Sequence, residues 1–154
     1  MRIVAFDVGR KHIGVAISDV SRTLARPVSV LNVSGRRDGV AAVLGEVTRF
    51  AAEEDGIDTI VVGLPRHLDG SPSDMTAVVE QFVLHLRAIV AVPVVLQDER
   101  LSSREAESRL ALTSKDWRAR KARLDAAAAA VMLQDYLDER GSAEMSAPST
   151  ELPQ

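Results

Sequence analysis

The chain has 154 residues, 46% hydrophobic and 27% charged, which is typical of one soluble globular domain. It contains no cysteine, which excludes disulfides, thiolate metal sites and a cysteine nucleophile. No apolar run approaches the roughly 20 residues of a membrane span, and the first residues do not resemble a signal peptide, so we expect a cytoplasmic protein with no membrane partner. The net charge of −3 argues against coating nucleic acid by bulk electrostatics but leaves room for a local basic patch.

The first part of the sequence predicts three antiparallel strands. Residues 2–7 read as a buried strand, because four consecutive apolar residues leave no polar face. After a turn at 8–11, alternating apolar residues predict a second strand at 12–18. A third strand is expected within 23–33, where Pro27 suits an edge position. The short connections predict an antiparallel meander.

The apolar pattern then alternates between helices and strands. It predicts a helix capped by Asp38, a strand at 59–62, a helix over 75–89, a strand at 92–97, a helix opened by a capping box of Ser102 and Glu105, and a last helix over about 121–139 that stops at Gly141. We therefore expect a domain at 1–141 and a disordered tail at 142–154.

This order of elements predicts the topology of an α/β fold. Strands four and five return through helices, so they should lie parallel to strand one. The predicted fold is a five-stranded mixed sheet in the order 3-2-1-4-5, with helices on both faces. Ligands of open α/β sheets bind where the strand order reverses, at the carboxyl ends of the strands. Residues 7–9, 63–65 and 98–100 should meet at that edge.

Two of these strand ends carry carboxylates. Asp7 ends an otherwise apolar strand, where its charge needs a cation or several hydrogen-bond donors; the alternative is an Asx-turn onto the hairpin. Asp98 and Glu99 are adjacent, so only one of them should face Asp7. The alternative is that Asp98 and Arg100 simply solvate the end of the strand.

A third carboxylate comes from the last predicted helix. Asp125 shares a helix face with Ala129, Met132 and Tyr136, which points it at the sheet. The small side chains of 126–130 should let the helix backbone come close to the strands. The alternative is a buried ion pair with an arginine or lysine.

Three carboxylates meeting at one sheet edge would suit Mg²⁺ or Mn²⁺, which prefer oxygen ligands. Such ions can activate water and stabilise the leaving oxygen of a phosphodiester. The three histidines, His12, His67 and His85, lack the spacing of a zinc site.

Basic residues surround the predicted edge and are candidates for contacts with phosphates. A cluster of positive charges lies just before Asp125, although a charge run of this kind can also be a solvated helix start. Gly9 would allow a phosphate to approach the backbone. The candidate substrate-binding residues are Gly9, Lys11, Arg66, His67, Arg100, Lys115, Arg118 and Lys121.

Four ordered blocks carry a resemblance to a known family. They are DVGRKHIGVAISD from residue 7, GLP from residue 63 with DG at 69–70, DERLSS from residue 98, and LD at 124–125 followed by AA at 128–129 and LQ at 133–134. Together they resemble the YqgF family of bacterial pre-16S rRNA nucleases, also described as Holliday-junction-resolvase-like proteins. The match runs from Met1 to about Leu137.

The resemblance implies an RNase H-like fold and a divalent-metal-dependent phosphodiesterase that matures the 5′ end of small-subunit ribosomal RNA in the cytoplasm, with ribosomal precursor particles as expected partners. It places the catalytic and metal-binding acids at Asp7, Glu99 and Asp125, and so favours Glu99 over Asp98. The sequence departs from the family pattern at Arg10, where threonine is usual, and at His12, where arginine is frequent.

Three other functions fit parts of this pattern. A resolvase of branched DNA would use the same residues but needs a dimer with two sites, and the sequence is compatible with either a monomer or a homodimer. A sugar-kinase-like or actin-like ATPase would need a second related domain. A ribosome-assembly factor could bind RNA without cutting it.

Overall fold

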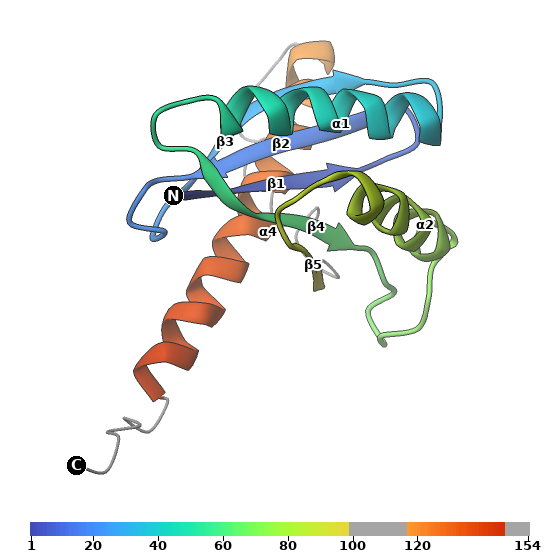
Figure 1. Ribbon diagram of the computed structural model, residues 1–154. Coiled ribbons are helices and arrows are strands. Elements are labelled where there is room, and N and C mark those ends of the chain that lie inside the picture. The colour runs from blue at the N-terminus through green and yellow to red at the C-terminus, as the bar shows by residue number, and fades with distance from the viewer. Residues whose placement is uncertain (99–116, 147–154) are drawn as a thin grey trace, which may run out of the picture.

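A five-stranded mixed sheet forms the centre of the computed structural model, which describes residues 1–98 and 117–146 (Figure 1). Its strands are β1 (Arg2–Val8), β2 (His12–Ser18), β3 (Ala25–Asn32), β4 (Ile57–Leu64) and β5 (Val94–Asp98). They lie in the order β3-β2-β1-β4-β5, with β1 antiparallel to β2 and parallel to β4. The predicted strand order is confirmed, and Pro27 lies in the edge strand β3 as expected.

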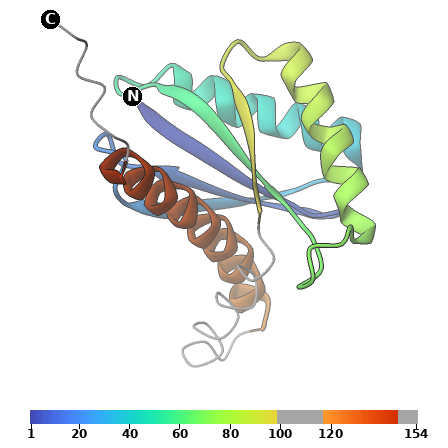
Figure 2. The ribbon, with the colours of Figure 1, turned by 90° about the horizontal axis from the view of Figure 1, so that it is seen from below.

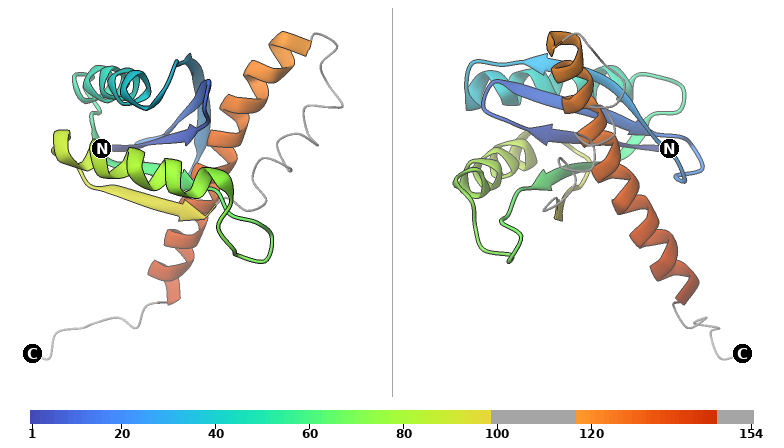
Figure 3. Two further views of the ribbon diagram at one scale, coloured as in Figure 1. Left: turned by 90° about the vertical axis from the view of Figure 1, so that its right-hand side faces the viewer. Right: turned by 180° about the vertical axis from the view of Figure 1, so that it is seen from behind.

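Helices cover both faces of the sheet. Helices α1 (Arg36–Ala51) and α2 (Asp74–Ile89) pack on one face, and α4 (Trp117–Ser146) lies on the other (Figure 2). Figure 3 shows α4 crossing the strands, with its C-terminal turns extending past them. No helix among the described residues is long and apolar enough to cross a membrane.

Alternation along the strands divides the core into two layers. On β1, Val4, Phe6 and Val8 pack with residues of α1 and α2. Ile3 and Ala5 point the other way, into a second cluster formed with α4. Because successive side chains of a strand point to opposite faces, this alternation decides which strand-end residues share a face with α4.

Three predicted helix ends are wrong, among them the start of α4, which lies at Trp117 rather than at about 121. Helix α1 begins at Arg36, after Gly35 with φ 143°, rather than at Asp38. The Asp38 carboxylate instead accepts hydrogen bonds from the Ser34 N–H and hydroxyl, at 2.9 and 3.2 Å. These bonds connect the first turn of α1 to the residues that precede the helix. Helix α4 continues through Gly141 to Ser146, because Gly141 has no positive φ and does not terminate it.

Other expectations for the C-terminal part remain predictions. The capping box of Ser102 and Glu105 lies outside the described residues, as do residues 147–154. The domain boundary at 141 stays a prediction, and residues 142–146 are helical rather than disordered.

Candidate functional site

Asp7 lies near the carboxyl end of β1, on the face that α4 covers. It follows Ile3 and Ala5 in the alternation of that strand, and both of these pack with α4. Asp7 is half-buried, whereas its neighbours Phe6 and Val8 are buried on the opposite face. Asp7 is therefore the polar position on this side of an otherwise apolar strand.

The residue opposite Asp7 is a glycine that allows α4 to approach. Asp7 pairs directly with Gly14 of β2. A Cβ added to Gly14 would lie 2.0 Å from the carbonyl oxygen of Asp125 and 2.7 Å from its carbonyl carbon. Side chains at directly paired antiparallel positions lie on the same face, about 4.5–5.5 Å apart. The peptide of Asp125 thus occupies the space that a side chain facing Asp7 would fill.

This contact places the backbone of Asp125 next to the strand pair that carries Asp7. Asp125 is half-buried and begins a run of small side chains, in which Ala126, Ala128 and Ala129 are buried. The expected close approach of helix and sheet is confirmed. Sequence reasoning did not single out Gly14, although a glycine inside an alternating strand is a signal of close backbone contact.

The alternation of side chains along β5 places Asp98 on the face of the sheet opposite α4. Val95 packs against the α4 cluster, and the buried Gln97 donates a hydrogen bond of 3.2 Å to Glu139 of α4. Asp98 follows Gln97 and is exposed on the other face, where it pairs with Leu64 of β4. Glu99, which is the predicted third acid, lies outside the described residues.

The described residues do not by themselves form a metal centre. Within 1–98 and 117–146 there is no group of three or more histidine, aspartate or glutamate side chains that could hold an ion. Asp7 and Asp125 supply two carboxylates, and a third ligand would have to come from the part of the chain that the structure does not describe.

Several predicted substrate-binding residues surround this edge. Lys11 is exposed in the β1–β2 turn, and Arg66 and His67 are exposed in the loop that follows β4. Arg118 and Lys121 lie in the first two turns of α4, before Asp125. Arg100 and Lys115 lie outside the described residues.

The loop after β4 has a defined shape. Arg66 and Pro72 form an isolated antiparallel β-bridge through their backbones, and the His67 N–H donates a hydrogen bond to the Ser71 carbonyl at 2.9 Å. Hydrogen bonds from Ser71, above all from its hydroxyl, lower the pKa of Asp69. The loop therefore presents a carboxylate beside its two basic side chains.

The first turn explains its own glycine. The Gly9 N–H donates to the His12 carbonyl at 2.9 Å, and a Cβ on Gly9 would lie 2.8 Å from that oxygen. The hairpin requires a glycine here whether or not a phosphate approaches. His12, one of the two departures from the family pattern, hydrogen-bonds Asn32 of β3 through Nδ1 at 2.8 Å.

Comparisons with known proteins agree on one family. A family model described as "RuvX: Holliday junction resolvase" matches residues 1–139. A protein of Anaeromyxobacter dehalogenans is 40% identical over 140 residues, covering 91% of this chain and 98% of the relative. A protein of Roseiflexus sp. is 34% identical over 139 residues, covering 90% and 95%. Both are named "Putative pre-16S rRNA nuclease".

Solved structures share the fold at low identity. Thermus thermophilus RuvC in complex with a Holliday junction substrate matches with a TM-score of 0.52 and 17% identity, covering 92% of this chain and 96% of that one. The Fowlpox virus resolvase in complex with Holliday junction DNA matches with a TM-score of 0.54 and 13% identity, covering 91% and 99%. These likenesses establish the RNase H-like fold.

Proposed function

The chain belongs to the RuvX family, and on that premise we propose that it is a divalent-metal-dependent nuclease that hydrolyses phosphodiester bonds at the 5′ end of precursor 16S ribosomal RNA. One observation supports the proposal of a catalytic edge: the carbonyl group of Asp125 lies against Gly14, which is the direct partner of Asp7 in the β1–β2 pair. The substrate follows from relatives 34–40% identical that are named for it. Its setting would be the cytoplasm, with ribosomal precursor particles as partners.

The donor set suits a hard cation. The two carboxylates come from a strand end and from a helix that contacts the neighbouring strand, and both are half-buried. Asp7, Asp125 and Glu99 would hold Mg²⁺ or Mn²⁺, which take oxygen ligands. When bound, such an ion supplies Lewis-acid chemistry at a phosphodiester. The role of the chain is to fix the carboxylates and orient the phosphate.

Basic side chains around the edge would orient the substrate backbone. Lys11 and Arg66 extend from two turns at the carboxyl ends of β1 and β4, and His67 lies beside Arg66. Arg118 and Lys121 belong to the helix that carries Asp125. We assign Arg100 and Lys115 to the same contacts with phosphates, and we propose that Gly9 allows a phosphate to approach the backbone. Contacts of this kind position a nucleic acid without reading its sequence.

A second candidate uses the same site on branched DNA. It is favoured by the description of the matching family, which is Holliday junction resolvase. Symmetric cleavage of a four-way junction requires two sites in a dimer, so this function predicts a homodimer in solution. Cleavage of a ribosomal RNA precursor is compatible with a monomer.

A cleavage assay with Mg²⁺ tests both candidates, using a precursor 16S rRNA fragment and a four-way DNA junction as substrates. Asp7→Asn, Glu99→Gln and Asp125→Asn should each lower the cleavage rate by at least about a hundredfold while circular dichroism shows an unchanged fold. The matched control is Asp98→Asn, which removes the neighbouring charge on the other face of β5 and should cleave like the wild type.

The outcomes separate the proposals. Full activity of Asp7→Asn would refute the carboxylate mechanism. Equal losses in Asp98→Asn and Glu99→Gln would show that the alternation on β5 does not select the third acid. Faster cleavage of the junction than of the RNA would favour the resolvase.

A further inference from the structure

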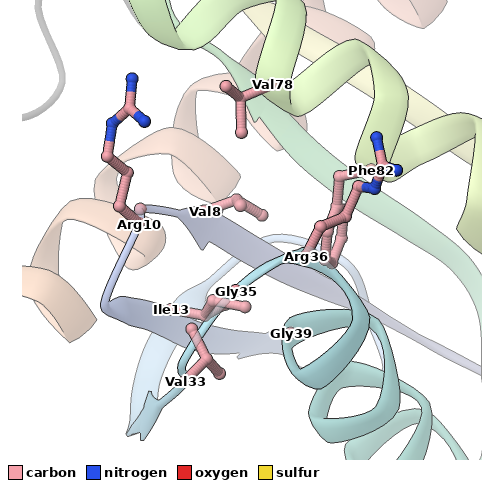
Figure 4. Close-up of a pocket in the computed structure, with 10 residues that line it drawn as sticks. Val8, Arg10, Ile13, Val33, Gly35, Arg36, Gly39, Val78 and Phe82 are labelled. Carbon is pink, nitrogen blue, oxygen red and sulfur yellow. The ribbon is translucent and has the colours of Figure 1, made fainter.

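A pocket opens on the face of the sheet opposite Asp7, at the carboxyl end of the same strand. It has a volume of about 180 Å³ and lies between the end of β1, the start of α1 and the side of α2 (Figure 4). Val8 and Ile13 line it from the sheet, and Val78 and Phe82 line it from α2. Its interior is therefore mainly apolar.

Two arginines lie at this pocket. Arg10 follows β1, Arg36 begins α1, and both are exposed. In Figure 4 they lie on either side of the apolar residues. Within the described residues neither guanidinium forms an ion pair with a carboxylate, and the nearby Asp38 bonds Ser34 instead. Their charge remains available to an anion.

The pocket is directly connected to the proposed catalytic edge. Val8 follows Asp7, and the two residues point to opposite faces of β1. Gly9, the next residue, also lines the pocket. A polymer chain that passes over the end of β1 could thus contact both sides of the strand with neighbouring units.

The chemistry of the pocket selects one class of occupant. An apolar cavity between two guanidinium groups suits a flat, weakly polar body that carries anionic groups at its ends. We propose that the pocket binds one unpaired nucleotide of the nucleic-acid substrate, with its base against Val78 and Phe82 and its flanking phosphates at Arg10 and Arg36. The proposal rests on the nuclease function and adds to it a preference for substrates with an unpaired nucleotide beside the cleaved bond.

Binding measurements with a labelled 12-nucleotide single strand test this pocket. The probes are an RNA strand with all its bases and an abasic strand of the same length, measured by fluorescence anisotropy in EDTA so that no cleavage occurs. The wild type should bind the strand with bases about tenfold more tightly than the abasic strand, because base contacts of this kind add affinity without sequence readout.

An aliphatic filling variant removes the space without adding an aromatic ring. Gly39→Ala combined with Val78→Leu should abolish the preference for bases and leave the binding of the abasic strand unchanged. A Cβ on Gly39 meets Ile13 and Phe82 at 3.4 and 3.5 Å, which is ordinary contact, so the fold should be retained. The control is Gly45→Ala combined with Ala77→Leu, a glycine-to-alanine change and an aliphatic enlargement to leucine at exposed positions of the same two helices outside the pocket.

A charge variant tests the phosphate contacts. Arg36→Gln should weaken the binding of both strands and lower the salt dependence by about one counterion. Arg37→Gln removes the same charge from the next exposed residue, which does not line the pocket, and should have a smaller effect.

Three results would overturn the proposal. They are equal binding of the two strands by the wild type, a preference for bases that survives in the filled variant, and binding of a free mononucleotide as tight as that of the strand. Because these measurements exclude cleavage, they are independent of the carboxylate variants. If Asp7→Asn loses cleavage but the filled variant still prefers the strand with bases, the nuclease function is supported and only the proposed nucleotide pocket is refuted.

Discussion

At the scale of single residues, Asp7 and Asp125 owe their positions to different neighbours. Asp7 is oriented by strand alternation, which buries Phe6 and Val8 on the other face. Asp125 is positioned by its own peptide, whose carbonyl fills the space beside Gly14. A cation held between them would therefore be bound by groups whose backbones cannot easily move, which is the preorganisation that a catalytic site needs.

A different carboxylate shows how the fold uses acids for structure. Asp19 accepts hydrogen bonds from the Thr23 and Leu24 N–H groups at 2.9 and 3.2 Å, and from the Ser21 hydroxyl at 2.9 Å. The Thr23 bond contributes most to lowering its pKa from 3.8 to about 2. These bonds hold the turn between β2 and β3.

The pKa of Asp19 predicts a sign for the effect of pH. Because its folded pKa lies below its unfolded value, Asp19 stabilises the fold above about pH 4, and this contribution is lost as the pH falls through about 2. An NMR titration of the Asp19 carboxyl carbon should give a midpoint near 2. Asp19→Asn should flatten the dependence of unfolding on pH in this window. A midpoint near 3.8 would mean that the hydrogen bonds of the turn do not stabilise the ionised Asp19 carboxylate.

The sequence predicts the acidic residues better than it predicts the residues that position them. The position of Asp7 follows from an apolar strand, and that of Asp125 from one helix face. Gly14 cannot be assigned a partner from the sequence, because the residue that fills its space lies more than a hundred positions away. The choice of Glu99 stays a prediction, supported by the opposite placement of Asp98.

At the scale of elements, the docking of α4 on the sheet completes the proposed site. The helix packs mainly on β2, β3 and β1. Gln134 fixes it to the β2–β3 turn, since its side chain accepts from the Ala25 N–H at 2.9 Å and donates to the Thr23 carbonyl at 2.8 Å. The Gly14 contact fixes its other half. The helix thus has two separate attachments, and one of them lies beside Asp7.

The attachment at Gly14 can be tested by adding one methyl group. Gly14→Ala places a Cβ 2.0 Å from a backbone oxygen, which no change of rotamer can relieve. We expect a loss of about 3 kcal/mol in the free energy of unfolding, together with loss of cleavage because Asp125 moves away from Asp7. Urea denaturation and the cleavage assay measure the two effects.

The control for this substitution is another glycine. A Cβ on the exposed Gly45 of α1 meets nothing within 4 Å, so Gly45→Ala should stabilise the protein by about 0.5–1 kcal/mol and leave cleavage unchanged. If Gly14→Ala were as stable and as active as Gly45→Ala, α4 would not depend on this contact.

The order of the elements followed from the sequence, but some of their ends did not. Period changes in the apolar pattern predicted correctly the five strands, their order in the sheet, and the three helices of the described residues. Asp38 was expected to cap α1 and Gly141 to end α4, because such residues commonly do so. In the structure Asp38 bonds back to Ser34, and the helix conformation at Gly141 simply continues. Local preferences of about 1 kcal/mol are readily overridden by neighbouring contacts.

At the scale of the whole molecule, the location of the positive charges matters more for nucleic-acid binding than the net charge does. A chain with a net charge of −3 can bind nucleic acid only if its positive groups gather at the binding edge. We propose that Lys11 and Arg66 in the turns after β1 and β4, and Arg118 and Lys121 in the sequence before Asp125, supply such groups. The proposed binding should therefore depend strongly on salt despite the negative net charge.

Removing part of this charge should lower that dependence. The double variant Arg118→Gln/Lys121→Gln should weaken RNA binding and reduce the slope of log affinity against log salt by roughly 1.5, since each phosphate contact releases counterions. The control is Arg49→Gln in the last turn of α1, where Arg49 pairs with Glu46 at 2.6 Å. Equal slopes for the wild type and the double variant would exclude these residues from the binding surface.

If acids distant in the sequence share a divalent ion at the end of β1, anomalous diffraction from crystals grown with Mn²⁺ should locate that ion. We predict an anomalous manganese peak about 2.0–2.3 Å from carboxylate oxygens of Asp7 and Asp125, with Glu99 as the third protein ligand. The peak should be absent in Asp7→Asn. No peak at that position in wild-type crystals grown with Mn²⁺, or a peak that persists unchanged in Asp7→Asn, would exclude a divalent ion held by these acids.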